Sequence, residues 1–234
     1  MKKTIIISGS NSQLSAGITE SLSKKYDIIF LYHSKQERIK SNKSSFYIKH
    51  SLNDDVSDLF KKIKRNNTKI HSIIHFNGVH NFKPLKLITR EDFNNTFEIN
   101  CLTFIKLIKL AHCFDGIYTI LSISSVSSKM GNKGISLYSS SKAALNNLIR
   151  SAALELSGRN TRVNNLILGH IDQGLGKQTL KYLNKKQLQT LKDNHPLGFG
   201  KVKDLFYALD FLLDSKKSRW ITGSELVLDG GYLA

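Results

Sequence analysis

Short apolar runs recur along the chain and are separated by segments with helical spacing. The runs are nearly continuous in apolar residues, which is typical of strands buried on both faces. The segments between them carry apolar residues three or four positions apart, as in Leu14, Ile18 and Leu22, which predicts amphipathic helices. This alternation predicts an α/β fold: a doubly wound parallel sheet of the Rossmann type, with helices on both faces and right-handed crossovers.

The same patterns place the individual elements. The predicted strands are residues 4–8, 28–32, 46–48, 70–76, 117–123, 163–168 and 225–228. The predicted helices are residues 13–25, 35–40, 56–63, 90–113, 136–157 and 202–213, and Asn53 or Asp54 is expected to cap the third of them. Residues 172–198 are polar and only weakly periodic, so they are interpreted separately below.

Composition indicates the number of domains and the cellular compartment to expect. A length of 234 residues with 40% hydrophobic content and only 2 prolines predicts one domain over residues 1–234. No segment looks like a signal peptide or is long enough to span a bilayer. Cys101 and Cys113 have neither disulfide nor metal-site spacing, and we expect buried thiols in a reducing cytoplasm and no metal.

The net charge of +17 is large, and it would suit nucleic acid, an anionic membrane or an acidic protein partner. The basic residues are scattered along predicted helices, and no Lys/Arg stripe is interleaved with exposed aromatic residues. We therefore expect a solvated surface, with no nucleic acid and no membrane as partner.

The segment from Ser122 to Lys142 contains the most reactive combination of side chains. Tyr138 and Lys142 are four residues apart on a predicted helix and share one face. A nearby ammonium lowers the pKa of a phenol from about 10, and the hydroxyl of Ser125 would hold a carbonyl or alcohol oxygen. Taken alone, a tyrosine and a lysine with this spacing usually lie on an exposed helix surface and have no function.

The predicted strand ends support a functional site here. Gly9, Gly78, Ser125 and Gly169 all follow predicted strands, so they share the sheet edge where ligands bind.

With these residues assembled, the chain resembles the short-chain dehydrogenase/reductase family over essentially its whole length, and within it the 3-oxoacyl-[acyl-carrier-protein] reductases. The resemblance rests on Tyr138-x-x-x-Lys142, on Ser125 and Asn100 upstream, and on the tail from Trp220 to Tyr232. It implies that Tyr138 donates a proton to a carbonyl, Lys142 lowers the pKa of that tyrosine and holds the nicotinamide ribose, and Ser125 binds the substrate oxygen. Asn100 would hold a water that links Lys142 to solvent.

The resemblance also implies a dinucleotide site, although its glycine loop is irregular. Gln13 and Ser15 stand where the family has glycines, and a positive φ at Gln13 would cost about 1 kcal/mol. The end of the second strand, from Leu31 to Lys35, has no acidic residue, and the next acid is Glu37. This favours NADP(H), with NAD(H) possible. The expected cofactor contacts are Gly9, Ser10, Asn11, Ser12, Gln13, Leu14, His33, Ser34, Lys35, Ser51, Leu52, Asn77, Gly78, Tyr138, Lys142, Gly169 and Ile171.

The substrate is less constrained. Residues 172–198 match the family's mobile substrate lid, in which Leu175, Leu180, Tyr182, Leu183, Leu188 and Leu191 would either line an acyl channel or pack two short helices together. His170 would hydrogen-bond a substrate or make a structural hydrogen bond in its loop. Arg159 matches an arginine that docks the carrier protein in the family. We expect a reductase of a 3-oxoacyl thioester on a carrier protein. The alternatives are a free or sugar-derived ketone and a nucleotide-binding protein without turnover. The resemblance implies a homo-tetramer or dimer.

Overall fold

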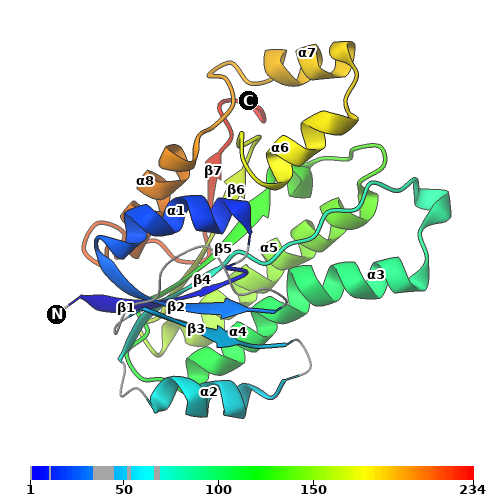
Figure 1. Ribbon diagram of the computed structural model, residues 1–234. Helices are drawn as coiled ribbons and strands as arrows, with labels where there is room; N and C mark the ends of the chain where they lie inside the picture. Colours follow the sequence, from blue (N-terminus) through cyan, green and yellow to red (C-terminus); the bar gives the residue numbers. More distant parts are fainter. Residues whose placement is uncertain (1, 11, 34–44, 52–53, 66–68) are drawn as a thin grey trace.

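A parallel sheet forms the centre of the computed structural model, which describes residues 2–10, 12–33, 45–51, 54–65 and 69–234. Its strand order is β3-β2-β1-β4-β5-β6-β7 (Figure 1). All neighbouring strands are parallel. The strands are β1 (Lys3–Ser8), β2 (Tyr26–Tyr32), β3 (Phe46–Lys49), β4 (Ile70–His75), β5 (Thr119–Ser125), β6 (Arg162–Leu168) and β7 (Glu225–Leu228). The strand order reverses between β1 and β4, which places a ligand-binding crevice at their carboxyl ends.

Helices cover both faces of the sheet, as predicted (Figure 1). One face carries α1 (Gln13–Ser23) and α8 (Val202–Leu213), and the other carries α2 (Val56–Lys64), α4 (Thr103–His112) and α5 (Ser136–Ser157). The remaining elements are η1 (Leu85–Leu87), α3 (Arg90–Phe97), η2 (Glu98–Leu102), η3 (Val126–Lys129), α6 (Leu175–Thr179), η4 (Leu180–Tyr182) and α7 (Lys185–Asp193).

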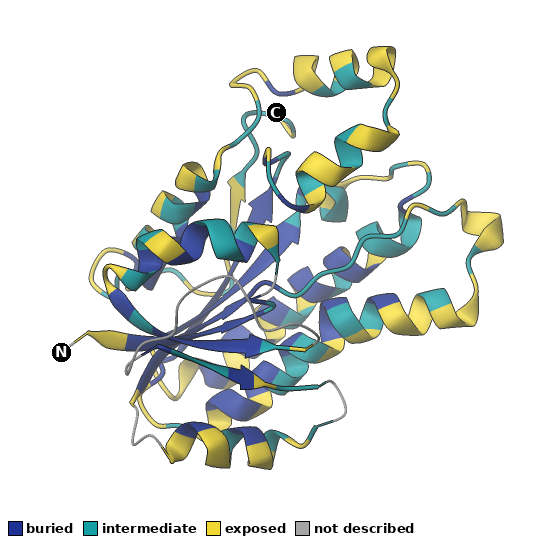
Figure 2. Ribbon diagram, viewed as in Figure 1, coloured by how far each residue is buried: buried dark blue, intermediate teal, exposed yellow. Residues whose placement is uncertain are grey.

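The apolar runs are buried because both faces of the sheet are covered (Figure 2). In β1, Ile5 and Ile7 pack toward α1 and α8, whereas Ile6 packs toward α2, α4 and α5. Each of these side chains is fully buried, which contributes roughly 2 kcal/mol by the hydrophobic effect. Leu145 and Ile149 of α5 belong to the same core, so intramolecular packing explains them without a subunit interface.

The structure corrects several local predictions. The cap of α2 is Asp55, whose Oδ1 accepts from the Ser57 backbone N–H at 3.0 Å, and not Asn53 or Asp54. The predicted helix over 90–113 contains a π-helical segment, η2, between α3 and α4. Cys101 is buried as expected, but Cys113 is exposed because it follows the last turn of α4. The predicted helix over 35–40 lies outside the described residues.

Two negative findings apply to the described part of the chain. No helix there combines the length and apolar character needed to cross a bilayer. Those residues also contain no group of His, Cys, Asp and Glu side chains arranged to hold a metal ion.

Candidate active site

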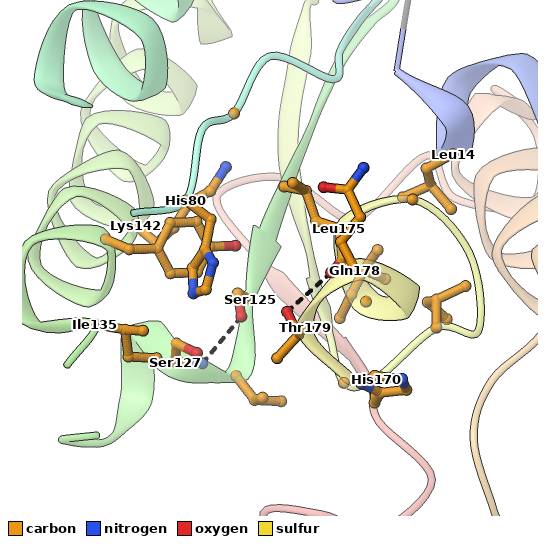
Figure 3. Close-up of a pocket in the computed structure, with 18 of the residues that line it drawn as sticks. Leu14, His80, Ser125, Ser127, Ile135, Lys142, His170, Leu175, Gln178 and Thr179 are labelled. Atoms are coloured by element: carbon orange, nitrogen blue, oxygen red, sulfur yellow. Dashed lines mark hydrogen bonds between the residues drawn. The ribbon is translucent and has the colours of Figure 1, made fainter. Parts of the chain in front are cut away.

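Two adjoining cavities lie at the carboxyl ends of the strands. The larger, about 700 Å³, is lined by Ser125, Tyr138 and Lys142, together with residues of α6 and α7 (Figure 3). The smaller, about 450 Å³, extends over Gly9, Ser10, His33 and Ser51. Ser12, Asn77 and Gly78 line both cavities, so the two form one groove across the β1/β4 switch point.

Lys142 is buried where α5 crosses the end of β5. Its Nζ donates to the backbone carbonyl of Ile123 at 2.9 Å and lies 6.0 Å from the centre of the Tyr138 ring. Burial lowers the pKa of Lys142 to about 8. Gly78 provides the room for this ammonium, because a Cβ at Gly78 would lie 3.3 Å from Nζ. The i, i+4 spacing therefore brings both side chains into the cavity wall, as predicted.

The side chains of Tyr138 and Ser125 lie together in the wall of the larger cavity. Burial raises the pKa of Tyr138, and the Ser125 hydroxyl only partly opposes that effect. The net shift is upward, and the predicted lowering of this pKa by Lys142 stays a prediction. The phenol is therefore neutral at pH 7, which is the state of a proton donor.

Ser125 is the serine of its cluster that stands beside the tyrosine. It ends β5, and its Oγ accepts from the Ser127 backbone N–H at 3.1 Å. Its neighbour Ser124 points to the other side of the strand and donates to Asn146 Oδ1 at 2.7 Å. Both residues line the larger cavity, but only the side chain of Ser124 is committed to a bond with α5.

Asn100 lies in the π-helical segment η2, and both N–H groups of its side-chain amide donate to protein atoms. Nδ2 donates to the Val79 carbonyl at 3.1 Å and to Ser141 Oγ at 2.8 Å, while Oδ1 accepts from the Val79 N–H at 2.8 Å. Ser141 Oγ donates in turn to the carbonyl of Tyr138 at 2.7 Å. Only one lone pair of Oδ1 is left for the predicted water, so the side chain of Asn100 mainly joins η2 to the start of α5.

His75 was not recognised as a site residue from the sequence. It is fully buried at the end of β4, with Nδ1 3.0 Å from Ser122 Oγ and Nε2 2.7 Å from Thr103 Oγ1. Thr103 Oγ1 donates to the Ile99 carbonyl at 2.7 Å, so it accepts from His75. His75 therefore carries its proton on Nε2 and accepts from Ser122. Burial holds its pKa well below the usual value, and the ring is neutral.

The predicted cofactor loop keeps a shape suited to phosphates. Ser12 caps α1 by accepting from the Ser15 N–H at 3.0 Å, and the N–H groups of Gln13 and Leu14 in the first turn have no partner among the described residues. Gly9 has φ +71°, and a Cβ there would lie 2.7 Å from the Asn77 backbone nitrogen. Free N–H groups at a helix start and a tight glycine turn fit a pyrophosphate.

The backbone conformation of Gln13 differs from the prediction. Among the described non-glycine residues, only Asn160 has a positive φ, so Gln13 sits in the first helical turn without the predicted backbone cost. Its carbonyl accepts from Gln173 Nε2 at 2.8 Å, which ties the start of the lid to the cofactor loop. Ser15 is fully buried within α1.

The other predicted residues divide between the groove and elsewhere. Leu14, Gly169, His170 and Ile171 line the larger cavity. Asn11, Ser34, Lys35 and Leu52 lie outside the described residues. The N–H of His170 donates to Nε2 of His195 at 3.2 Å, and its ring packs 4.1 Å from that of Phe199.

Arg159 is remote from the cavity. It donates to the Phe114 carbonyl at 3.0 Å and lies 3.5 Å from Asp115. These residues precede β5 at the amino edge of the sheet, and α5 spans about 30 Å between Tyr138 and that edge at 1.5 Å per residue.

The lid residues are also divided. Leu175, Leu183 and Leu191 line the larger cavity, and Tyr182 lines a neighbouring one. Leu180 and Leu188 line neither, so the cavity-lining interpretation applies to only part of this segment and the packing interpretation stays a prediction.

Comparison with known proteins agrees with this geometry. A family model described as Enoyl-(Acyl carrier protein) reductase matches residues 33–233. The 3-oxoacyl-[acyl-carrier-protein] reductase of Bos taurus is 31% identical over 186 residues, which covers 76% of this chain and 72% of that protein. Carbonyl reductase family member 4 of Xenopus tropicalis is 31% identical over 189 residues, with 77% and 74% covered.

A solved structure extends the agreement to nearly the whole chain. 4-hydroxyisoleucine dehydrogenase complexed with NADH superposes with a TM-score of 0.87 at 26% identity, covering 99% of this chain and 98% of that one. A Ser–Tyr–Lys set beside a dinucleotide-sized groove on a parallel sheet defines an NAD(P)-dependent oxidoreductase. The chain belongs to the short-chain dehydrogenase/reductase family.

Proposed function

We propose that the chain is an NADPH-dependent ketoreductase that reduces a 3-oxoacyl thioester to the 3-hydroxyacyl product. The observation that carries this proposal is the convergence of Ser125, Tyr138 and Lys142 on one cavity wall, with the Lys142 ammonium 6.0 Å from the centre of the Tyr138 ring. The substrate carbonyl oxygen would lie between the two hydroxyls. Among the relatives, 3-oxoacyl-[acyl-carrier-protein] reductases support this choice of substrate, and a carbonyl reductase supports the alternative of a free ketone.

The nicotinamide cofactor, when bound, supplies the hydride that reaches the carbonyl carbon. Tyr138 donates its phenolic proton to the carbonyl oxygen as negative charge develops there. Ser125 donates a second hydrogen bond to that oxygen and fixes its position. Lys142 stabilises the tyrosinate that remains, because its ammonium lies behind the ring. Gln13 and Leu14 would offer their N–H groups to the pyrophosphate, and Gly9 would give it close access.

NADP(H) is proposed over NAD(H) because of the charge around the smaller cavity. His33, His50 and Lys106 line it, and no Asp or Glu is among its described lining residues. A 2′-phosphate would be attracted there, whereas an acidic residue would repel it. The solved relative carries NADH, so the preference needs direct measurement.

The substrate is proposed to be attached to a carrier protein, and the carrier would dock on one subunit and react at the active site of another. Because Arg159 lies about 30 Å along α5 from Tyr138, it would guide a carrier to the active site of another subunit. The dimer or tetramer that this requires has a suitable surface. Exposed apolar side chains lie on α8, on β7 and between them, namely Phe211, Trp220, Leu226 and Val227.

The proposal is tested with a panel of substrates and purified protein. NADPH consumption is followed with an acetoacetyl thioester and with a simple aliphatic ketone, and NADPH formation from NADP⁺ is followed with an aldohexose. We expect the thioester to give the highest kcat/KM and a 3-hydroxyacyl product. A higher kcat/KM for the aldohexose or the simple ketone would replace the proposed substrate by that class. No turnover with any of the three would reject the proposal.

A further inference from the structure

His80 lies in the cavity wall directly beside the proton donor. It follows Gly78 by two residues, and its ring meets that of Tyr138 edge-on, with ring centres 4.7 Å apart. Phe82 supports it from behind at 4.8 Å. Figure 3 shows His80 in front of Lys142 and facing the same space as Ser125. A group bound next to Tyr138 would therefore also touch this imidazole.

The ring nitrogens of His80 are available to a ligand. No hydrogen bond joins them to any side chain or backbone group of the described residues. Burial lowers the pKa of His80, so the ring is neutral at pH 7 and offers one N–H donor and one acceptor. This differs from His75, whose two nitrogens are both bonded within the protein.

A second free polar group faces His80 from the lid. Gln178 of α6 lines the larger cavity together with His80, and its amide has no hydrogen bond to a described residue. Both residues also line a third cavity of about 460 Å³ that opens between residues 80–83 and α6. In Figure 3 the two side chains come from opposite walls of the space above Ser125. A substrate that leaves Ser125 toward this opening passes between them.

The charge of the lining narrows the class of group that fits. Among the described lining residues of the larger cavity there is no Asp or Glu, and Lys133 and Lys142 are the cations. An ammonium on the substrate would have no partner there. A carbonyl or carboxylate oxygen would accept from the imidazole N–H and from the amide of Gln178.

We propose that His80 and Gln178 bind a second oxygen of the substrate, the oxygen of a carbonyl group one methylene away from the carbonyl that is reduced. This inference rests on the proposed function and deepens it, because it makes His80 a determinant of specificity for 1,3-dicarbonyl compounds. A thioester, an ester and a free carboxylate share this oxygen. A ketone without the second carbonyl leaves the polar pair unpaired when the site closes.

The test compares two matched ketones in the full-length enzyme with NADPH. One is an acetoacetyl thioester, and the other is the thioether in which a methylene replaces the thioester carbonyl. We expect the wild-type enzyme to prefer the thioester, and His80→Leu to lower the ratio of the two kcat/KM values about 30-fold, which equals about 2 kcal/mol of selective binding. His80→Asn keeps an N–H donor and should restore most of the ratio. His112→Leu removes an exposed imidazole from α4 and serves as the control.

Each outcome separates the two proposals. An unchanged ratio in His80→Leu, with the wild type active on the thioester, overturns the role of His80 and leaves the ketoreductase proposal intact. A wild type that reduces neither ketone overturns both. Acetoacetate, tested beside the thioester, identifies the source of the second oxygen. A higher kcat/KM for acetoacetate, lost in His80→Leu, assigns the site to a free 3-oxo acid.

Discussion

The ammonium of Lys142 donates to the backbone carbonyl of Ile123 at 2.9 Å, inside the protein and next to the ring of Tyr138. Burial lowers the pKa of Lys142 from 10.5 to about 8, so the folded state binds this proton less tightly than the unfolded chain does. The charge therefore costs stability in full below about pH 8, and this cost fades as the pH rises toward 10.5. In the proposed function, this cost is offset by the role of the ammonium beside the tyrosine.

This relationship predicts that Lys142→Met stabilises the fold at pH 7 while it abolishes turnover. The pKa difference corresponds to about 3 kcal/mol, from which the lost bond to Ile123 subtracts about 1 kcal/mol. Above about pH 8 the lysine of the folded protein is mostly neutral, and the lysine of the unfolded chain loses its proton as the pH approaches 10.5. The stability difference between the variant and the wild type should therefore shrink over this range. Urea unfolding of both proteins at pH 7 and pH 10 measures this. A variant that is less stable at pH 7 would contradict it.

The bonds of His75 predict a different pH dependence. His75→Leu leaves Ser122 and Thr103 without their buried partner, and we expect a loss of about 2–4 kcal/mol of unfolding free energy. His75→Asn, which can still bond, should lose less. Because the folded pKa of His75 is depressed, its contribution is present above the unfolded value of 6.5 and is lost as the pH falls below it.

Thermal unfolding between pH 7.5 and pH 5 tests the pH dependence. The wild type should lose more stability over this interval than His75→Asn does. Parallel curves for the two proteins would mean that the His75 ring is not held neutral.

The helical conformation of Gln13 predicts that a more regular glycine loop brings no benefit. Gln13→Gly should not tighten dinucleotide binding, since the existing residue already has a negative φ and leaves its N–H free. It should instead destabilise α1 by about 1 kcal/mol. Calorimetric titration with NADPH gives the affinity, and Gln13→Ala, which removes the side chain without adding a glycine, is the control. Tenfold tighter binding in Gln13→Gly would show that the side chain obstructs the cofactor.

Much of this fold is predictable from the sequence because its strands are short, apolar and bounded by Gly, Ser or Asn. Residues 136–157 and 202–213 were predicted to the residue as α5 and α8, since apolar periodicity and helix length agree there. The π-helical segment around Asn100 was not, because apolar spacing continues through it from α3 to α4. Asp55 was missed as a cap because three candidate residues stand side by side in the sequence.

The candidate site was predictable only where residues lie at strand ends or one helical turn apart. Ser125, Tyr138 and Lys142 satisfy those rules and converge on one cavity. His80 lies in an irregular segment, where no periodicity tells which way a side chain points, so its place beside Tyr138 required the structure. The position of Arg159 past the end of α5 was predictable, because helix length alone sets it about 30 Å from Tyr138, and its role in docking a carrier stays a prediction.

The central claim is that Tyr138 is the proton donor for carbonyl reduction, and the most direct test is turnover by Tyr138→Phe with an acetoacetyl thioester and NADPH. Phe keeps the ring and its packing in the cavity wall, so the variant should fold, and its NADPH affinity is measured alongside turnover. We predict that kcat falls at least 1,000-fold, or about 4 kcal/mol of transition-state stabilisation. A Tyr138→Phe enzyme that keeps a rate within tenfold of the wild type would contradict the account.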